Sequence, residues 1–438
     1  MIFRLRDYVF YPHRIVREHR WLAASQHWTE DERRTWMRQR LGALLDHAVT
    51  NVPWYRDTLG PYRNQIPEMV ESLDISELPL LTKEDVRRNY DLLRADDYPK
   101  YRPTTTETSG STGTPTKFML DAESNVHQFA AIWRVLNWAG YRFGQPYADM
   151  TGFLPKNDGL WQYDWRTNCL HLSSFNFKKE HIPAYVDRLR KFNPVFIKAY
   201  PSALHLFCRW LVELGIDDYR PRRVLTCAES LLDHQKALFE QTLKCPVYDF
   251  YGQNERGALI STCELGTYHV HEEYALTEFV PTDQSGTASI VATNLHNWAM
   301  PLIRYRTDDL AELGDQSPCR CGRTYRTVKR IYGRIEDVVV TPDGRHVGRL
   351  DAAFKYSPGI RMSQVVQDRP SDIEVRIVRA DTFGQSDLDT LKRELRARLG
   401  PAIGISYVYV DDIAPGRNGK VKFMVSTIGQ TTTDPSAA

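Results

Sequence analysis

A segment rich in glycine and hydroxyl groups between residues 106 and 118, TETSGSTGTPTKF, has the residue types that bind phosphate. Glycines permit positive φ angles and a close approach of the backbone to a ligand, while hydroxyls and backbone N–H groups donate to phosphate oxygens. The candidate phosphate-binding residues are Ser109, Gly110, Ser111, Thr112, Gly113 and Thr114. No Gly-Lys-Ser/Thr is present, so the segment is not a Walker A loop. Its composition alone would also fit a flexible surface loop.

Two further polar loops follow predicted strands, CAES at 227–230 and YGQNE at 251–255. A carboxylate at Glu255 could coordinate Mg²⁺ between triphosphate oxygens. Tyr251 could stack on a purine. Taken singly, Glu255 could equally be an exposed salt-bridge partner and Tyr251 a core residue, so these loops become informative only together with other motifs.

Thiols and imidazoles gather in two short segments. CELGTYHVHEEY supplies the thiol of Cys263 and the imidazoles of His269 and His271, and PCRCGRTY supplies Cys319 and Cys321. Zinc prefers four sulfur or nitrogen ligands in a tetrahedron, so three thiolates and one imidazole would form a closed structural site. The alternative is isolated cysteines and surface histidines, because a C-x-C pair is a weaker signal than two C-x-x-C pairs.

The composition is that of a globular protein with two or three domains. The 438 residues are 42% apolar and 26% charged with a net charge of +2, which gives no reason to expect nucleic acid or an anionic membrane as a partner. No apolar run is long enough to cross a bilayer and the first residues do not form a secretory signal, so we expect a cytoplasmic protein. Seven cysteines in such a chain favour reduced thiols or metal ligands over disulfides.

The elements that must position these loops alternate between helix and strand. Capping boxes at Thr29 with Glu32 and at Thr82 with Asp85 predict two helix starts. Apolar residues at helical spacing predict a helix over 125–138, directly behind the phosphate-binding segment. The alternation that follows predicts a largely parallel sheet covered on both faces, with ligands at the carboxyl ends of its strands. Near the end of the chain, a helix over 386–400 between two strands predicts a compact α+β unit.

Five motifs occur in the order found in adenylate-forming enzymes. They are TSGSTGTP at 108–115, YGQNE at 251–255, YRTDDL at 305–310, GRIEDVVV at 333–340 and PGRNGK at 415–420. The chain resembles the phenylacetate–CoA ligase-like branch of this superfamily, and within it the CapK-like proteins, over nearly its whole length. The resemblance implies an α/β fold, in which residues 1–333 form a large domain of mixed and parallel sheets flanked by helices. Residues 334–438 would form a small α+β lid with a hinge at Glu336.

The resemblance also implies a two-step reaction. A carboxylate attacks the α-phosphate of ATP in the presence of Mg²⁺ to give an acyl-adenylate and pyrophosphate, and CoA then displaces AMP. An amine or a carrier-protein thiol is the alternative acceptor. An alternative function of another class is that of a nucleotide-binding protein that has lost catalytic activity and acts as a partner in a biosynthetic complex. The acid would be small and could be aromatic, given the aromatic residues between Trp133 and Tyr200, and a homodimer is the commonest soluble assembly.

By similarity, each motif has a role in this reaction. Residues 109–114 would hold the phosphates, and Lys420 would reach the α-phosphate and the acyl oxygens. Glu255 would bind Mg²⁺, Asp309 would accept from the ribose hydroxyls, and Arg334 would assist there. The adenine pocket would be lined by Ala228, Glu229, Ser230 and Tyr251, and Gly252 and Gln253 would also bind the nucleotide.

The family pattern also marks two departures and selects one metal ligand. Relatives commonly have Thr where this chain has Asn254 and Gly where it has Asp308, and aspartate adopts left-handed φ angles less readily than glycine. Some relatives place a histidine at the matching Gly-x-His position. The resemblance therefore selects His269 over His271 as the fourth ligand of a zinc knuckle within residues 263–321.

Overall fold

The structure is a computed structural model of the chain. It describes residues 12–108, 116–153, 155, 159–173, 178–229, 231, 233–282, 288–331, 339–343, 346–347, 350–354, 356–357, 359–413 and 424–426. Five parts of the predicted site lie outside these ranges, and they are the segment 109–114, Ser230, Arg334, the hinge residue Glu336 and Lys420. The predicted domain boundary at 333/334 lies outside them too.

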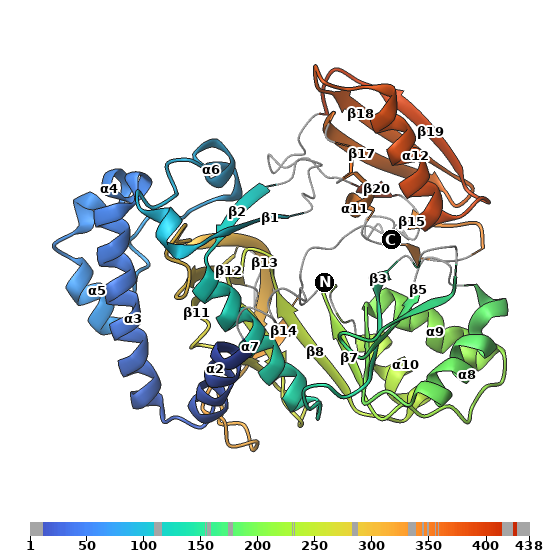
Figure 1. The fold of residues 1–438 in the computed structure, drawn as a ribbon, viewed down its shortest axis with the longest axis horizontal. Helices are drawn as coiled ribbons and strands as arrows, with labels where there is room; N and C mark the ends of the chain where they lie inside the picture. Colours follow the sequence, from blue (N-terminus) through green and yellow to red (C-terminus); the bar gives the residue numbers. More distant parts are fainter. Residues whose placement is uncertain are drawn as a thin grey trace, which may run out of the picture.

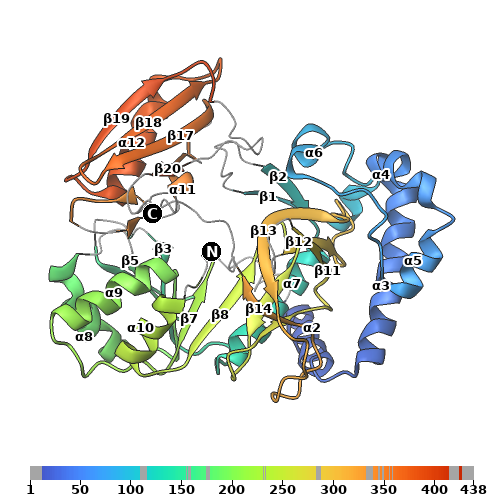
Figure 2. The same ribbon diagram turned by 180° about the vertical axis from the view of Figure 1, so that it is seen from behind.

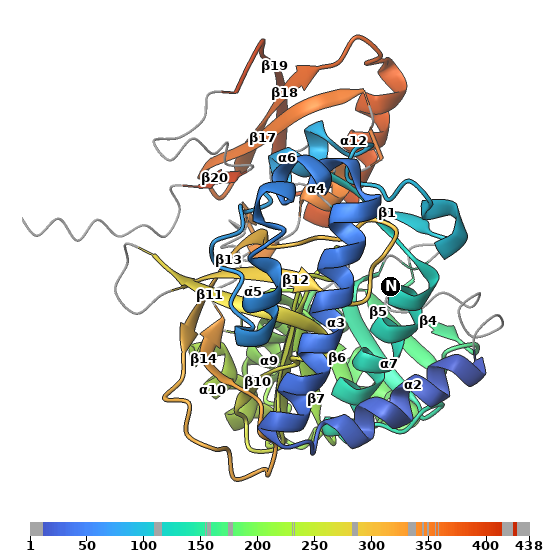
Figure 3. The ribbon, with the colours of Figure 1, turned by 90° about the vertical axis from the view of Figure 1, so that its left-hand side faces the viewer.

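The described part of the chain begins with a helical arm. Its helices are α2 (Pro12–Ser25), α3 (Glu30–Asn51), α4 (Pro53–Thr58), α5 (Ile66–Ser72) and α6 (Lys83–Arg88). Both predicted capping boxes are confirmed: the Glu32 N–H donates to Thr29 Oγ1 over 3.3 Å, and the Asp85 N–H donates to Thr82 Oγ1 over 3.1 Å. Figure 3 shows α3 from the side with α5 packed next to it. A hairpin, β1 (Thr104–Thr108) and β2 (Thr116–Leu120), then leads into α7 (Ala122–Trp138).

Among the described residues, a twelve-stranded mixed sheet forms the centre of the molecule. In spatial order its strands are β11 (Ala275–Pro281), β12 (Ala288–Asn294), β13 (Tyr305–Leu313), β14 (Thr327–Ile331), β10 (Tyr268–Val270), β9 (Leu259–Thr262), β8 (Val247–Gly252), β7 (Val224–Cys227), β6 (Ile197–Ala199), β3 (Tyr147–Phe153), β5 (Cys169–Ser173) and β4 (Trp161–Asp164). Strands β8, β7, β6, β3 and β5 run parallel, while β9 pairs with β8 in the antiparallel sense. The parallel half predicted from the sequence is therefore joined to an antiparallel half.

Helices cover both faces of the parallel half (Figures 1 and 2). One face packs against α8 (Ile182–Phe192), α9 (Pro201–Glu213) and α10 (Asp233–Leu243) around a core that includes Phe207 and Phe239. On the other face α7 packs over β7 and β8, and α2 lies along α7. Helix α7 therefore connects the end of the phosphate-binding segment to the middle of the sheet.

The last part of the chain forms a small α+β domain above the parallel half of the sheet (Figure 1). Its four-stranded sheet has the order β19 (Gly404–Tyr409), β18 (Asp372–Arg379), β17 (Ile360–Arg369), β20 (Met424–Ser426). Its remaining elements are β15 (Val339–Val340), β16 (His346–Val347), α11 (Asp351–Phe354) and α12 (Gln385–Leu399). Leucines along one side of α12 are buried against the sheet in a core separate from those of the large domain. The predicted fold class, a large α/β domain followed by a small α+β domain, is confirmed.

Candidate active site and metal cluster

Three of the residues predicted to bind the nucleotide meet between β8 and β13. The hydroxyl of Tyr251 donates to Asp309 Oδ2 over 2.7 Å, although the two residues are 58 positions apart. The side-chain amide of Gln253 contacts the same tyrosine oxygen and lies 3.5 Å from Asp309 Oδ2. Asp309 is only 8% exposed. This carboxylate is thus fixed in direction and could accept hydrogen bonds from a diol.

Glu255 lies in the same loop and is also tied to β13. Its side chain is 4% exposed and accepts a hydrogen bond of 3.1 Å from the hydroxyl of the buried Tyr305. The loop itself is closed by the Ala258 N–H, which donates to the side-chain oxygen of Gln253 over 3.1 Å. Strand β13 therefore positions two acidic side chains, one through Tyr305 and one through its own Asp309.

The loop after β7 lies at the same edge of the sheet. Because Cys227 is paired with Phe250 in parallel register, Ala228 and Glu229 follow β7 at the level where Tyr251 and Gly252 end β8. Ala228 adopts a left-handed φ of 66°, which turns the chain away from the strand. The predicted adenine-binding residues that the structure describes are thus brought to one edge of the sheet.

Asp308 also has a left-handed backbone, with a φ of 64°. Glycine adopts this conformation more readily than aspartate, so the glycine that relatives commonly have at this position would fit the same backbone. The carboxylate of Asp308 accepts a 3.1 Å hydrogen bond from Nε of Arg306. Its charge is therefore paired with a guanidinium next to the predicted ribose position.

The four predicted zinc ligands lie together between β9, β10 and the loop that precedes β14. Their ligand atoms are all within 4.8 Å of one another. Cys263 Sγ lies 3.9 Å from Cys319 Sγ, and Cys321 Sγ lies 3.4 Å from His269 Nε2. Bonds of about 2.3 Å to sulfur in a tetrahedral zinc site separate two sulfurs by about 3.8 Å, so this donor set and its spacing fit zinc.

His271 is engaged elsewhere. Its Nε2 lies 2.7 Å from the hydroxyl of Ser261, and its Nδ1 contacts the guanidinium of Arg134. Both ring nitrogens thus have protein partners outside the cluster. The geometry favours His269 as the imidazole ligand.

The chain is similar in sequence and in fold to several known proteins. The family called CapK C-terminal domain matches residues 339–427. Protein CapK of Staphylococcus aureus is 24% identical over 89% of this chain and 88% of its own, and a phenylacetate-coenzyme A ligase of Pseudomonas putida is 27% identical over 69% and 70%. A 2-hydroxyisobutyryl-CoA ligase, solved in complex with 2-HIB-AMP and CoA, has the same fold, with a TM-score of 0.57 and 20% identity over 92% of each chain.

Over most of its length the chain is similar to members of the adenylate-forming enzyme superfamily. The similarity is to the CapK-like and phenylacetate–CoA ligase-like branch of that superfamily. None of the described helices is long and apolar enough to cross a membrane.

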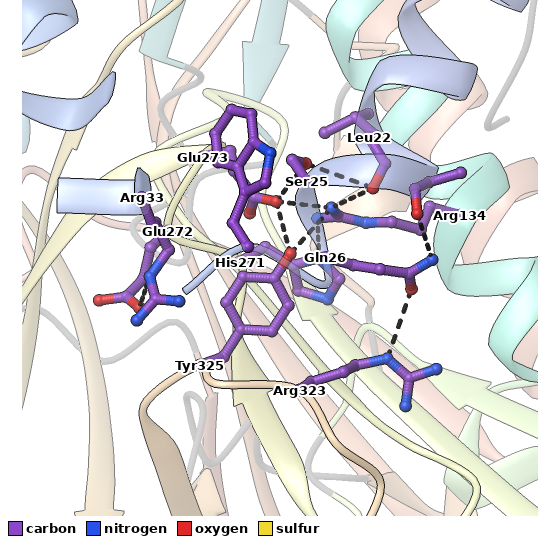
Figure 4. A network of polar contacts seen from close by, with 12 residues as sticks. Leu22, Ser25, Gln26, Arg33, Arg134, His271, Glu272, Glu273, Arg323 and Tyr325 are labelled. Carbon is purple, nitrogen blue, oxygen red and sulfur yellow. Dashed lines mark hydrogen bonds and ion pairs between the residues drawn. The ribbon is translucent and has the colours of Figure 1, made fainter. Parts of the chain in front are cut away.

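A buried polar network next to the metal cluster was not predicted from the sequence (Figure 4). Arg134 on α7 and Glu273 form an ion pair of 2.9 Å in which neither side chain is more than 1% exposed. The same carboxylate accepts from Ser25 Oγ over 2.6 Å and from the hydroxyl of Tyr325. A signal was present, because Arg134 interrupts the apolar face of an amphipathic helix, but its partner lies 139 residues away.

The loop that carries Cys319 and Cys321 also contacts the helical arm. The side chain of Arg33 donates to the carbonyl of Thr324 over 2.9 Å and forms an ion pair of 2.8 Å with Glu272. Thr324 Oγ1 donates to the carbonyl of Trp28. The metal cluster, α7 and the corner between α2 and α3 therefore form one packed unit.

Proposed function

We propose that this protein is an ATP- and Mg²⁺-dependent ligase that activates a small carboxylic acid as its acyl-adenylate and transfers the acyl group to CoA. The observation that carries the proposal is that the YGQNE and YRTDDL motifs meet: Tyr251 and Gln253 contact Asp309 of β13, and Glu255 contacts Tyr305 of β13. Relatives named as phenylacetate-coenzyme A ligases support the same chemistry.

The described residues can supply the positioning that adenylation needs. Asp309, held by Tyr251, would accept from the ribose hydroxyls and fix the nucleotide at the edge of the sheet. Glu255 would hold Mg²⁺, which neutralises charge on the phosphates when bound. Among residues outside the described ranges, the segment 109–114 would contact the phosphates and Arg334 the ribose. Lys420 would stabilise the charge that develops at the α-phosphate as the carboxylate attacks.

The metal cluster would hold a structural zinc ion. Its four side chains supply a closed set of three thiols and one imidazole, which leaves no position open for substrate. Bound zinc would fix the loop before β14, and through Thr324 and Tyr325 it would fix the helical arm. We therefore assign this ion to stability and not to the reaction.

The test is acid-dependent exchange of labelled pyrophosphate into ATP across a panel of carboxylic acids. Exchange with at least one acid is expected, and Lys420→Ala should nearly abolish it while Lys422→Ala, a neighbouring lysine, retains it. Absence of exchange with every acid, in protein that binds ATP by calorimetry, would favour a nucleotide-binding partner without catalysis.

The acceptor is tested separately, because adenylation does not depend on it. AMP release is measured with the best acid and with CoA, a set of amines or a carrier protein. We expect CoA to accelerate AMP release most. Faster release with an amine or a carrier thiol would keep adenylation and change the assigned acceptor.

A further inference from the structure

A row of polar side chains crosses the parallel strands β6, β3 and β5 and the antiparallel edge strand β4. In the register of the sheet, Gln162 on β4 pairs with His171 on β5, His171 with Asp149 on β3, and Asp149 with Lys198 on β6. Residues paired in this way point to the same face, and neighbouring strands are about 4.8 Å apart. An amide, an imidazole, a carboxylate and an ammonium group therefore form one line of about 15 Å, the polar row.

The polar row is unusual for its position. Strands buried in a parallel sheet are normally apolar throughout. Here Asp149 and Lys198 are 7% and 4% exposed and form an ion pair of 2.8 Å, and the other carboxylate oxygen of Asp149 accepts from the Thr151 N–H over 2.9 Å. Burying an ion pair generally gains no stability over apolar side chains of the same size. The polar row thus calls for a role other than holding the sheet together.

The polar row lies on the face of the sheet that α7 shares. Lys198 is paired with Leu225, which belongs to the apolar core between α7, β7 and β8. The opposite face is filled by the core under α8, α9 and α10. An acyl group attached to a nucleotide at the ends of β7 and β8 therefore meets packed side chains under α7 and on the opposite face. The remaining part of this face, over β3, β5 and β6, carries the polar row.

The polar row is also close to the edge where the nucleotide would bind. His171 stands two residues before the end of β5, and Lys198 one residue before the end of β6. These strands run parallel to β7 and β8, so their carboxyl ends lie at the edge that carries Ala228 and Tyr251. In parallel sheets this edge is where ligands bind.

The charges of the polar row cancel. Lys198 is paired with Asp149, and burial lowers the pKa of His171 below its ordinary value, which leaves the imidazole neutral near neutral pH. A second carboxylate on the ligand would have to compete with Asp149 for the ammonium group. A hydroxyl, which both donates and accepts, can bond to a neutral imidazole and an amide without disturbing the ion pair.

We propose that the polar row forms the far end of the acyl-binding site, and that the acid this protein activates carries a hydroxyl group remote from its carboxylate. The inference rests on the proposed function, since it assumes an acyl-adenylate at the edge of the sheet. His171 and Gln162 are its specificity-determining residues. His171 is half-buried and stacks on Phe153 with ring centroids 4.5 Å apart, which holds the imidazole in a defined orientation.

The experiment compares matched acids in the pyrophosphate exchange assay, each pair differing by one hydroxyl. Suitable pairs are 4-hydroxyphenylacetate with phenylacetate and 6-hydroxyhexanoate with hexanoate. A site built to bond a hydroxyl should prefer the hydroxylated member by about tenfold or more in kcat/KM in at least one pair. His171→Phe keeps an aromatic ring next to Phe153. It should bring the ratio of kcat/KM between the two acids of the pair close to one. The control His205→Phe changes a histidine of α9, on the opposite face, and should leave the preference as it was.

Thermal melting of each variant accompanies the assay. If His171→Phe does not fold, Gln162→Leu replaces it in the assay. The preference of the wild-type protein for the hydroxylated acid tests the inference without any variant. Equal or better exchange with the unsubstituted acid in every pair overturns the inference and leaves the proposed function in place. A preference that survives both His171→Phe and Gln162→Leu also overturns it. No exchange with any acid overturns the proposed function and this inference together.

Discussion

Replacing Glu255 with glutamine separates the charge of this side chain from its structural role. The buried carboxylate has a 3.1 Å hydrogen bond to Tyr305, and the side-chain oxygen of glutamine can accept the same bond. We therefore expect Glu255→Gln to change the free energy of unfolding by no more than about 1 kcal/mol. With an entropy of unfolding of about 2.1 cal/mol/K per residue, that corresponds to a shift in Tm of about 1–2 °C for a chain of this length.

The effect on activity should be far larger. Loss of one preorganised group that stabilises transition-state charge typically costs about 2.7–4 kcal/mol, or a factor of about 10²–10³ in rate. Pyrophosphate exchange should fall by that factor, and the Mg²⁺ concentration for half-maximal exchange should rise at least about tenfold, because an anionic ligand is lost.

Tyr305→Phe is the matched control for this prediction. It removes the hydrogen bond to Glu255 but keeps the carboxylate, so exchange should fall by only about tenfold, the value of one hydrogen bond. An unchanged exchange rate and an unchanged Mg²⁺ dependence in Glu255→Gln would refute the metal-binding role. A Tm lowered by much more than 2 °C would refute the structural part of the reasoning.

Three further predictions concern the rest of the large domain. Untagged protein should contain about one zinc ion per chain by elemental analysis, and Cys319→Ser should lose most of it, whereas zinc-free wild-type protein would contradict the site. Glu273→Gln should lower the unfolding free energy in urea by about 3–5 kcal/mol because it leaves the buried guanidinium of Arg134 unpaired, and the double change to leucine at both positions should cost less than that. Burial raises the pKa of Asp249 to about 6 from 3.8, so the folded protein holds this proton more tightly than the unfolded chain. The unfolding free energy should therefore fall by at most about 3 kcal/mol as the pH rises from about 4 to above 6, and a urea series on Asp249→Asn should lack this part of the pH dependence.

Local signals in the sequence were sufficient for much of the fold. The capping boxes at Thr29 and Thr82 involve residues only three positions apart, so they can be read without knowledge of the tertiary structure. The alternation of strands and helices before residue 252 likewise predicted the parallel strands that the structure contains. The nucleotide-binding and zinc roles came from motif order and ligand types, and they stay predictions although the described side chains lie together.

The features that the sequence did not reveal depend on long-range pairing. The polar row exists because β4, β5, β3 and β6 are neighbours in that order, which is not their order in the chain. A shift of one residue in any strand would send its side chain to the other face. The ion pair of Arg134 with Glu273 also depends on long-range pairing. The two residues are 139 positions apart in the sequence, and only the tertiary structure brings them together.

The attachment of the helical arm to the loop before β14 has a consequence for biosynthesis. Glu273, the hydrogen-bond partner of Ser25, is synthesised 248 residues after it, and Thr324, the partner of Arg33, is synthesised 291 residues after it. A ribosome adds about 5–20 residues per second, so these two contacts would stay unformed for roughly 12–60 s after the first helices are made. Nascent chains of this protein should therefore depend on chaperones until three quarters of the polypeptide has emerged.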